Sequence, residues 1–299
     1  MKFKDIFARF QLVFEKAWQS IVKIALFLSL YLSAFLYWSI RSRSLGFLIG
    51  VNPGIRLGGT VGYSKFGVLR RLPADKIPRS VLLWKAVSPG EVEEMMRGQE
   101  LRFPVILKPD TGLQSMGVQK IDSLPELKNY LLKVQRNLIL QEFVKTEAEF
   151  AVLYYRQPGQ TQGKIFSFAQ RMRNPNGLAS TTCVSMNHLI TTQLERVFDE
   201  LSQTVDGFYF GRYDVLADSV ADLEQGHFKI VELNGANSMP LHLYDPRVPL
   251  VQRIREFRTY WRILYAISSR NEADGQVKNG TLGRYFYEMA SVMSAVVMV

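Results

Sequence analysis

Two short stretches in the second half of the chain bring acidic and amide side chains onto neighbouring strand-like runs. The first is Gly-Arg-Tyr-Asp at 211–214, and the second is Glu-Leu-Asn at 232–234. They offer the carboxylates of Asp214 and Glu232 and the amide oxygen of Asn234. Hard oxygen atoms of this kind are the ligands that hold Mg²⁺ against a polyphosphate. The pattern therefore predicts a magnesium site formed by these three residues.

A lysine and a flexible loop lie upstream of these stretches. The run Phe-Pro-Val-Ile-Leu-Lys-Pro-Asp at 103–110 predicts a strand that ends near Lys108, and the loop Thr-Gly-Leu-Gln-Ser-Met-Gly follows at 111–117. A cation, a flexible loop and a magnesium cage in one chain are the parts of a site for ATP. We therefore expect ATP and Mg²⁺ as cofactors.

The composition narrows the class of protein. The 299 residues are 47% hydrophobic, which is enough for one large core or two modest ones. The single cysteine, Cys183, excludes an internal disulfide framework and fits a reducing compartment. The three histidines are scattered without zinc spacing, so we expect ordinary structural histidines.

The net charge of +10 is concentrated near the N-terminus. Residues 1–71 hold eleven Lys and Arg but only two acidic residues, whereas the rest of the chain is nearly balanced. A protein that binds nucleic acid usually spreads such charge over a folded face. Here the charge flanks the most apolar part of the chain, which favours an anionic membrane surface, and not nucleic acid, as a partner.

Residues 1–45 predict a helix that associates with a membrane. Apolar and aromatic residues recur every three or four positions from Phe3 to Ala25, which is typical of an amphipathic helix. This helix merges into 24–40, a run without a charged residue that would make roughly 25 Å of helix. The run is short for a span, so we favour a cytoplasmic protein whose helix lies on the inner face of a membrane. A span and a buried soluble helix stay open, whereas the basic residues at 41–43 argue against a cleaved signal peptide.

The remaining pattern predicts an α+β protein, because helices interleave with strands without a regular βαβ rhythm. Strands are expected at 45–51, 82–85, 105–108, 118–121, 138–144, 149–155, 164–171, 208–216 and 227–233. Helices are expected at about 88–95, 124–134, 188–205, 248–268 and 282–299.

A glycine-dense loop at 58–65 has two interpretations. Gly58, Gly59 and Gly62 permit positive φ and a close backbone approach, as in turns that bind anions, and Lys65 would then face the ligand. An ordinary irregular loop is equally compatible with the pattern. A second lysine, Lys85, ends an apolar run and is expected where a buried strand meets solvent.

The order and spacing of these motifs resemble the ATP-grasp ligases, and within them the D-alanine–D-alanine ligase branch. The resemblance covers roughly residues 100–245 and is carried by Gly-Arg-Tyr-Asp-Val-Leu-Ala-Asp at 211–218 and Val-Glu-Leu-Asn-Gly at 231–235. It implies an ATP-grasp fold, in which two α+β subdomains clasp ATP, here preceded by the apolar N-terminal helix. The expected regions are a membrane-associating helix at 1–45, a substrate-side region with the glycine-rich loop at 46–100, an ATP-grasp core at 101–250 with its lid at 101–140 and its metal-binding half at 145–250, and a C-terminal helical tail at 251–299.

The resemblance also implies which residues bind the nucleotide. Lys108 matches the lysine that enters the ATP phosphates from the lid. The segment 110–117 matches the loop that closes over those phosphates with backbone N–H groups. Its residues expected to bind ATP are Gly112, Ser115 and Gly117. The segment 141–144 matches the hinge that reads adenine.

Within that hinge, Gln141 or Glu142 would take the adenine amino group, and the hinge ends at Val144. Glu149 matches the acid that binds the ribose hydroxyls, although it lies one residue further from the hinge than the family spacing. Arg171 falls where a basic residue normally touches phosphate.

The same resemblance assigns Asp214, Glu232 and Asn234 to the metal and Arg212 to the reacting carbonyl. It implies a ligase that phosphorylates a carboxylate with ATP and lets an amine or similar nucleophile attack the acyl phosphate, forming a C–N bond. The run Gly-Ala-Asn-Ser-Met-Pro after Asn234 differs from the run with which the branch usually grips its substrate. The N-terminal region differs too, because the apolar helix takes up part of the length that the family uses for a compact substrate domain. We therefore expect a small-molecule or lipid-linked carboxylate other than D-alanine.

Two alternatives to a ligase stay open. One is an ATP-grasp kinase that phosphorylates a hydroxyl group and forms no acyl phosphate. The other is a nucleotide-binding membrane protein without turnover. The complete set of Lys108, Arg212, Asp214, Glu232 and Asn234 argues against the second, since a degenerate site would have lost some of them.

Overall fold

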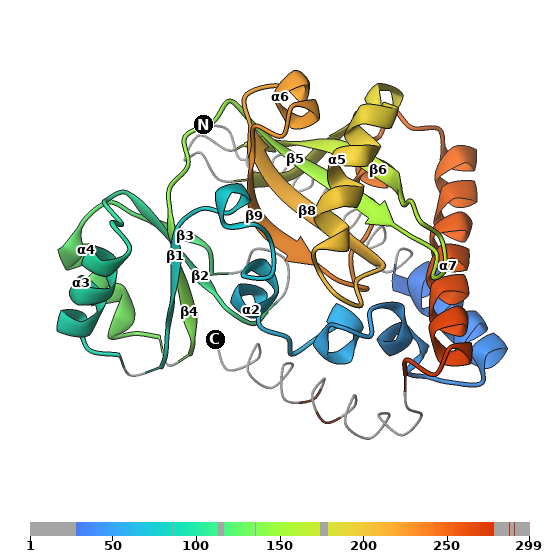
Figure 1. Cartoon of the computed structure of the whole chain (residues 1–299), viewed down its shortest axis with the longest axis horizontal. Helices are drawn as coiled ribbons and strands as arrows, with labels where there is room; N and C mark the ends of the chain where they lie inside the picture. Colours follow the sequence, from blue (N-terminus) through green and yellow to red (C-terminus); the bar gives the residue numbers. More distant parts are fainter. Residues whose placement is uncertain are drawn as a thin grey trace, which may run out of the picture. The chain divides into compact units, whose positions relative to one another are not determined.

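The chain folds into two compact units, Met1–Leu45 and Gly46–Val299. Figure 1 shows the chain coloured along its sequence. The computed structural model describes residues 28–85, 87–112, 117–134, 136–173, 179–277, 287 and 290.

The first unit contains a helix at 28–42. Apolar side chains face outward along it, and Leu32, Tyr37 and Ile40 are exposed. The uncharged helix expected at 24–40 is present over its described part, whereas the amphipathic helix expected from Phe3 to Ala25 lies outside the described residues. In the described part of the chain, no helix is both long enough and apolar enough to cross a membrane.

A small sheet of four antiparallel strands lies in the second unit, with the strand order β1-β4-β2-β3. Its elements are β1 (Ser80–Leu83), α3 (Pro89–Gly98), β2 (Val105–Pro109), β3 (Gln119–Ile121), α4 (Leu124–Leu131) and β4 (Leu138–Glu142). Alternate strand residues such as Leu107 and Leu140 pack in a core with the two helices, which lie on one side of the sheet (Figure 1). Because strand side chains alternate, Lys108 and Gln141 fall on the opposite face.

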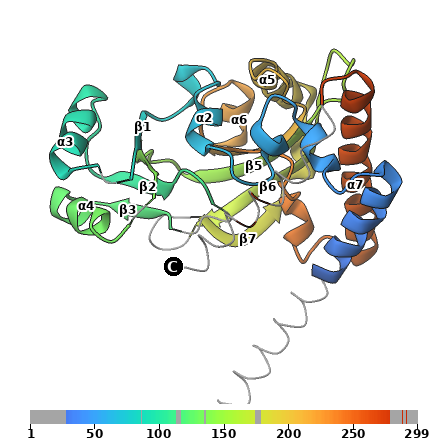
Figure 2. The ribbon, with the colours of Figure 1, turned by 90° about the horizontal axis from the view of Figure 1, so that it is seen from below.

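A large sheet of five antiparallel strands has the order β7-β6-β5-β8-β9. Its strands are β5 (Ala148–Tyr155), β6 (Lys164–Arg173), β7 (Ala179–Ser185), β8 (Phe210–Ala217) and β9 (Lys229–Asn234). Helices α5 (Thr192–Gln203) and α6 (Val220–Glu224) lie on one side of it (Figure 2). Phe150, Phe168 and Tyr213 belong to the core on that side. Their immediate neighbours Arg212 and Asp214 consequently point to the other face.

The segment before the first strand packs on the long helix α7 (Leu250–Ala273). The prediction of a strand at 45–51 is wrong, because this run forms the 3-10 helix η1 (Phe47–Val51). The Oγ of Ser268 donates to the carbonyl of Phe47 at 2.5 Å, and the Nδ2 of Asn271 donates to the carbonyl of Gly50 at 2.8 Å. An apolar run of this length can be strand or buried helix, and here contacts with α7, rather than a partner strand, decide the outcome.

A buried asparagine ties the next loop to the large sheet. Asn52 is fully buried, and its Oδ1 accepts from the backbone N–H groups of Tyr209 and Phe210 at 2.8 and 2.9 Å. Its Nδ2 donates to the carbonyls of Gly58 and Phe210 at 3.0 and 2.8 Å. One side chain thus holds the glycine-rich loop beside the start of β8.

The other elements follow the expected order with shifted boundaries. Helix α5 begins at Thr192 and not at His188, because the side chain of Thr191 accepts from the backbone of Leu194 as an N-cap. Strand β7 and helix α6 were not expected from their polar sequences. The helix expected at 282–299 lies outside the described residues apart from 287 and 290. The remaining short helices are η2 (Arg56–Gly59), α2 (Lys65–Leu69), η3 (Ala74–Lys76), η4 (Asn187–Leu189) and η5 (Leu241–Tyr244).

Candidate active site

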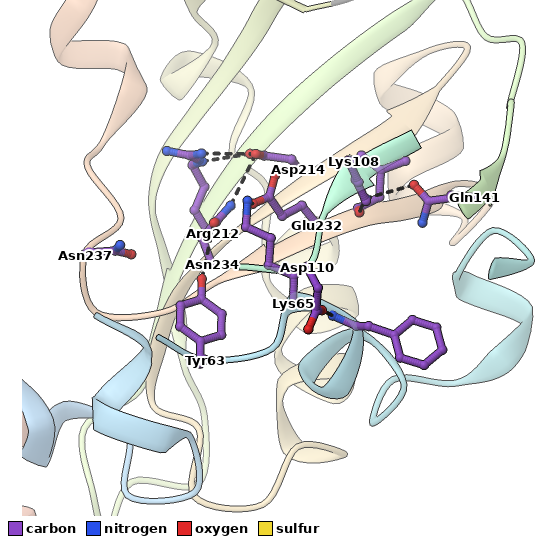
Figure 3. Close-up of polar contacts among 12 residues, drawn as sticks. Tyr63, Lys65, Lys108, Asp110, Gln141, Arg212, Asp214, Glu232, Asn234 and Asn237 are labelled. Carbon is purple, nitrogen blue, oxygen red and sulfur yellow. Dashed lines mark hydrogen bonds and ion pairs between the residues drawn. The ribbon is translucent and has the colours of Figure 1, made fainter. Parts of the chain in front are cut away.

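Strands β8 and β9 present four polar side chains as two facing pairs. In the antiparallel register Arg212 lies opposite Asn234, and Asp214 lies opposite Glu232. One residue separates the pairs along each strand, so all four side chains emerge on the same face of the large sheet. The intervening Tyr213 is buried in the core on the other face. One strand pairing therefore brings together the three expected metal ligands and Arg212 (Figure 3).

Asp214 is the centre of the polar contacts. Its Oδ1 accepts from Arg212 Nε at 2.7 Å, and its Oδ2 accepts from Arg212 Nη2 at 3.0 Å and from Asn234 Nδ2 at 3.4 Å. Burial by itself lowers the pKa of Arg212, but the charge and hydrogen bonds of Asp214 outweigh it and raise that pKa above its ordinary value. Arg212 is therefore a permanent cation in the site.

Glu232 pairs with Lys65, the lysine of the glycine-rich loop. The Nζ of Lys65 lies 2.7 Å from the Oε1 of Glu232, and both side chains are mostly shielded from solvent. Burial by itself raises the pKa of Glu232, but the nearby charges of Lys65 and Lys108 lower it below its ordinary range. Glu232 is therefore an anion, and Lys65 is a second cation that faces the site from α2.

Asp110 holds the start of helix α2 in place. Its Oδ1 accepts from the Oγ of Ser64 and from the backbone N–H of Phe66, each at 2.9 Å. The backbone N–H of Lys65 also donates to the Asp110 carbonyl at 3.0 Å. Asp110 follows the strand that carries Lys108, so it couples the positions of two site lysines. Asp110 was not among the site residues expected from the sequence, although its place directly after the Lys-Pro pair was a signal for it.

Lys108 reaches from the small sheet to the large one. Its Nζ donates to the Oε1 of Gln141 at 3.0 Å and to the carbonyl of Val231 in β9 at 2.6 Å. Burial lowers the pKa of Lys108 to about 8, and the negative charge of Glu232 only partly opposes this shift. The lysine is thus a cation that loses its proton within the range of ordinary enzyme assays.

A further ion pair extends the site along the large sheet. Glu149 and Arg171 lie opposite each other in the β5–β6 register, and Arg171 Nη1 donates to Glu149 Oε1 at 2.9 Å. The same Nη1 lies 3.6 Å from Asp214 Oδ2. The pair expected to bind ribose and phosphate is therefore continuous with the pairs on β8 and β9.

The remaining expected nucleotide residues lie at the margins. The carboxylate of Glu142 points to Arg79, with Oε1 and Nη2 2.8 Å apart, while Gln141 faces Lys108. Val144 is half-buried just beyond β4. Gly112 and Gly117 lie at the two ends of the loop that is expected to close over the phosphates, and both have positive φ. Ser115 lies outside the described residues, and Lys85 is exposed.

The glycine-rich loop contributes a tyrosine that our sequence analysis missed. The hydroxyl of Tyr63 donates to the Oδ1 of Asn234 at 3.4 Å. Burial raises the pKa of Tyr63, so this hydroxyl keeps its proton. Gly59 has a φ of 74°, and a Cβ there would lie 2.7 Å from the Cα of Gly235. The glycine is needed for this close approach, which brings the loop against the residues that follow Asn234.

Two buried donors in the site have no acceptor among the described residues. They are the Nε2 of Gln141 and the Nε of Arg171. Buried donors are nearly always hydrogen-bonded in folded proteins. Both belong to residues expected to contact ATP, and phosphate oxygens or the acceptor atoms of a base would satisfy them.

The oxygen atoms of the site fit Mg²⁺ in chemical kind. Asp214 and Glu232 supply two carboxylates and Asn234 supplies an amide oxygen, all on one face. The described residues contain no metal cluster of three or more His, Cys, Asp or Glu, and none is needed for a set that includes an amide. Lys65 pairs with Glu232 and Arg212 pairs with Asp214, so each of the two carboxylates faces a cation.

Comparisons with known proteins bear on the fold. No protein-family model and no curated protein sequence matches the chain. Similar solved structures include the VanG D-Ala:D-Ser ligase from Enterococcus faecalis, with a TM-score of 0.49, 15% identity and coverage of 69% of this chain and 61% of that one. The D-alanine-D-alanine ligase from Coxiella burnetii has a TM-score of 0.48 at 10% identity and covers 71% and 58%. The ADP complex of PurK, an N5-carboxyaminoimidazole ribonucleotide synthetase, has a TM-score of 0.48 at 18% identity and covers 71% and 52%.

The chain thus spans about half to three fifths of the length of these proteins. The α+β class expected from the sequence is confirmed by the two antiparallel sheets and their helices. At such identities the likeness concerns the fold alone.

Proposed function

We propose that the protein is an ATP-dependent ligase that activates a carboxylate as an acyl phosphate for attack by an amine or a similar nucleophile. The observation that carries the proposal is the two facing pairs on β8 and β9, Arg212 with Asn234 and Asp214 with Glu232. Lys108 approaches them from the small sheet. Carboxylates for a metal and cations for phosphate lie within one hydrogen-bonded group. This combination suits the transfer of a phosphoryl group, where catalysis is mostly positioning and charge neutralisation.

In this proposal, the cations of the site hold the phosphates of ATP. Lys65 pairs with Glu232, Lys108 reaches the backbone of β9 at Val231, and Arg171 lies 3.6 Å from Asp214. Asp214, Glu232 and Asn234 would hold Mg²⁺, which when bound neutralises the charge of the transferred phosphoryl group. The small sheet serves as the lid, and the loop at 110–117 excludes water from the acyl phosphate.

Arg212 has a separate task in the second half of the reaction. The nucleophile adds to the carbonyl carbon of the acyl phosphate, negative charge builds on the carbonyl oxygen, and phosphate then leaves. Arg212 is held by two hydrogen bonds to Asp214, so its guanidinium needs no reorganisation to face that oxygen. One such donor is typically worth ~2.7–4 kcal/mol in the transition state.

The setting of the reaction is part of the proposal. The exposed apolar helix at 28–42 and the basic N-terminal charge support attachment to the inner face of a membrane from the cytoplasm. Such a location suits a carboxylate or a nucleophile that is itself linked to a lipid.

The proposal is tested by incubating the full-length protein with Mg²⁺-ATP and pooled metabolites, including a lipid extract, and identifying products by mass spectrometry. A ligase releases ADP and free phosphate together with a condensed product. A phosphorylated product without free phosphate would instead identify a kinase of hydroxyl groups, and release of AMP would contradict both.

Two substitutions then assign the residues. Arg212→Met should retain binding of Mg²⁺-ATP but turn over at least ~100-fold more slowly, as expected for loss of one oxyanion donor. Glu232→Gln should abolish turnover in a protein that still folds, because strand packing is nearly unchanged, but loss of the ion pair with Lys65 should lower its melting temperature. Arg270→Met is the matched control, because Arg270 is exposed on α7 and pairs only with Asp274 among the described residues. If ATP binding collapses in Arg212→Met while a melting curve shows an intact fold, the role of Arg212 in acyl transfer is refuted.

A further inference from the structure

The long helix α7 exposes a group of large apolar side chains near its start. Leu250, Val251 and Ile254 are 63%, 70% and 50% exposed. Most other apolar residues of the helix, such as Trp261 and Leu264, are buried. The exposed group therefore lies on a side of α7 that the rest of the second unit does not cover.

Three arginines continue the same face of α7. Arg255, Arg258 and Arg262 are exposed and follow the apolar group at helical spacings of three and four. At about 100° per residue, the six side chains lie within an arc of roughly 140°. No ion pair within the described part of the chain involves any of the three arginines.

Acidic residues are absent from this arc between Leu250 and Arg262. The one acid in that stretch, Glu256, lies on another side of the helix and bonds to the buried His242. The face thus joins uncompensated positive charge to exposed apolar area, a combination that we call the basic–apolar face of α7.

We propose that the basic–apolar face of α7 lies on the surface of an anionic lipid membrane. Arginines at the level of the headgroups would meet lipid phosphates, and the three apolar side chains would enter the boundary of the acyl chains. Nucleic acid would pair with the arginines but would leave the apolar group in water. Membrane lipid is therefore the partner that suits both halves of the face.

The connection to the first unit supports this assignment. The chain enters the second unit at Gly46, and η1 packs directly on α7 through Phe47 and Gly50. In the chain, the apolar helix at 28–42 is thus followed directly by a segment that packs on α7. The inference rests on the membrane association in the proposed function but not on the reaction.

The first test measures binding of the full-length protein to vesicles. We compare phosphatidylcholine vesicles that contain phosphatidylglycerol with vesicles of phosphatidylcholine alone. At about 1 kcal/mol for each basic residue near an anionic surface, the combined Arg255→Gln, Arg258→Gln and Arg262→Gln variant should bind the anionic vesicles roughly 100-fold more weakly.

A charge-matched control changes three basic residues of the small-sheet region. Arg97→Gln, Arg102→Gln and Lys133→Gln remove the same charge from exposed positions. This variant should bind nearly as the unaltered protein does. An equal loss in the two triple variants would show a general charge effect and overturn the proposal.

The second test reports on α7 even if the N-terminal helix alone keeps the protein on vesicles. A polarity-sensitive fluorophore is attached at Leu250→Cys, since the native Cys183 is buried. Its emission should shift to the blue on anionic vesicles and be quenched by spin-labelled lipid, whereas the same fluorophore at Lys133→Cys should keep its aqueous spectrum.

Three outcomes of the second test would overturn the proposal. They are no response at position 250 in vesicle-bound protein, a blue-shifted spectrum before vesicles are added, and the same shift with duplex DNA or RNA in place of lipid. The second outcome would mean that another part of the protein covers the face. None of these measurements depends on turnover, and Arg212→Met should bind vesicles as the unaltered protein does. Failure of the membrane proposal for α7 is therefore distinct from failure of the ligase assignment.

Discussion

Raising the pH from 7 to 9 should weaken ATP binding through one buried lysine. Burial lowers the pKa of Lys108 to about 8, so its ammonium group is mostly charged at pH 7 and mostly neutral at pH 9. A bound phosphate favours the charged form, and the pKa of Lys108 should therefore rise toward its ordinary range in the complex. The sign follows directly: affinity is highest below pH 8 and is lost as the pH rises through 8.

The size of the effect comes from the charged fraction of the free enzyme. That fraction falls from ~0.9 at pH 7 to ~0.1 at pH 9 for a group with this pKa, so the affinity should fall about tenfold, or about 1.4 kcal/mol. At pH 8 the free lysine is half charged, and each ATP that binds should take up about half a proton.

Isothermal titration calorimetry measures both quantities. Titrations with Mg²⁺-ATP at pH 7, 8 and 9 give the affinity, and buffers of different protonation enthalpy give the proton uptake. Lys108→Arg is the control, because a guanidinium group stays charged across this range. It should bind with little dependence on pH.

The charged groups that act on Lys108 are Glu232, Lys65, Asp214 and Glu149. Glu232 has a lowered pKa and is ionised throughout the range tested. An affinity for the unaltered protein that is constant from pH 7 to 9, or a tenfold fall that persists in Lys108→Arg, would refute the reasoning.

Three substitutions test what supports the site, and chemical denaturation measures each. Gly211→Ala should lower the free energy of unfolding by ~1–3 kcal/mol or more, because the added Cβ would lie 2.3 Å from the carbonyl oxygen of Asn234. Gly90→Ala is the control and should be nearly neutral, because the space around Gly90 is open. Asn52→Ala should lower it by about 3 kcal/mol or more, since it leaves several buried backbone groups without a partner; a loss below ~1 kcal/mol would contradict this account. Asp110→Ala should lower it by ~1–3 kcal/mol, because two hydrogen bonds at the start of α2 are lost, and should also weaken ATP binding. An unchanged ATP affinity would separate Asp110 from the site.

The local part of the site was accessible from the sequence. Strand side chains alternate, so the apolar positions that flank Arg212 and Asp214 already predict that these two side chains share a face. Glu232 and Asn234 follow after one short helix and repeat the same spacing on the next strand. Antiparallel pairing of neighbouring strands then brings the two pairs together, with no information needed from the rest of the chain.

The supports of the site depend on contacts between distant parts of the sequence. Lys65 reaches Glu232 because Asp110 bonds to Ser64 and Phe66 at the start of α2, and Asn52 reaches the start of β8 from the glycine-rich loop. A single side chain in a loop carries no periodic signal, so its partner cannot be read from its own neighbourhood. The run at 45–51 shows the same limit, since its apolar residues allowed strand or helix and α7 selected the helix.

The sequence by itself determined the α+β class, the alternation along β8 and β9, and the chemical kind of the candidate site, because each depends on residues close together in the chain. Only the tertiary structure decided that Lys65 faces Glu232, that the pKa of Lys108 falls, and that the arginines of α7 share a face with exposed apolar residues. The physical reason is that burial, electrostatic coupling and exposure are properties of the packed surroundings. Those surroundings are assembled from segments that the sequence does not place side by side.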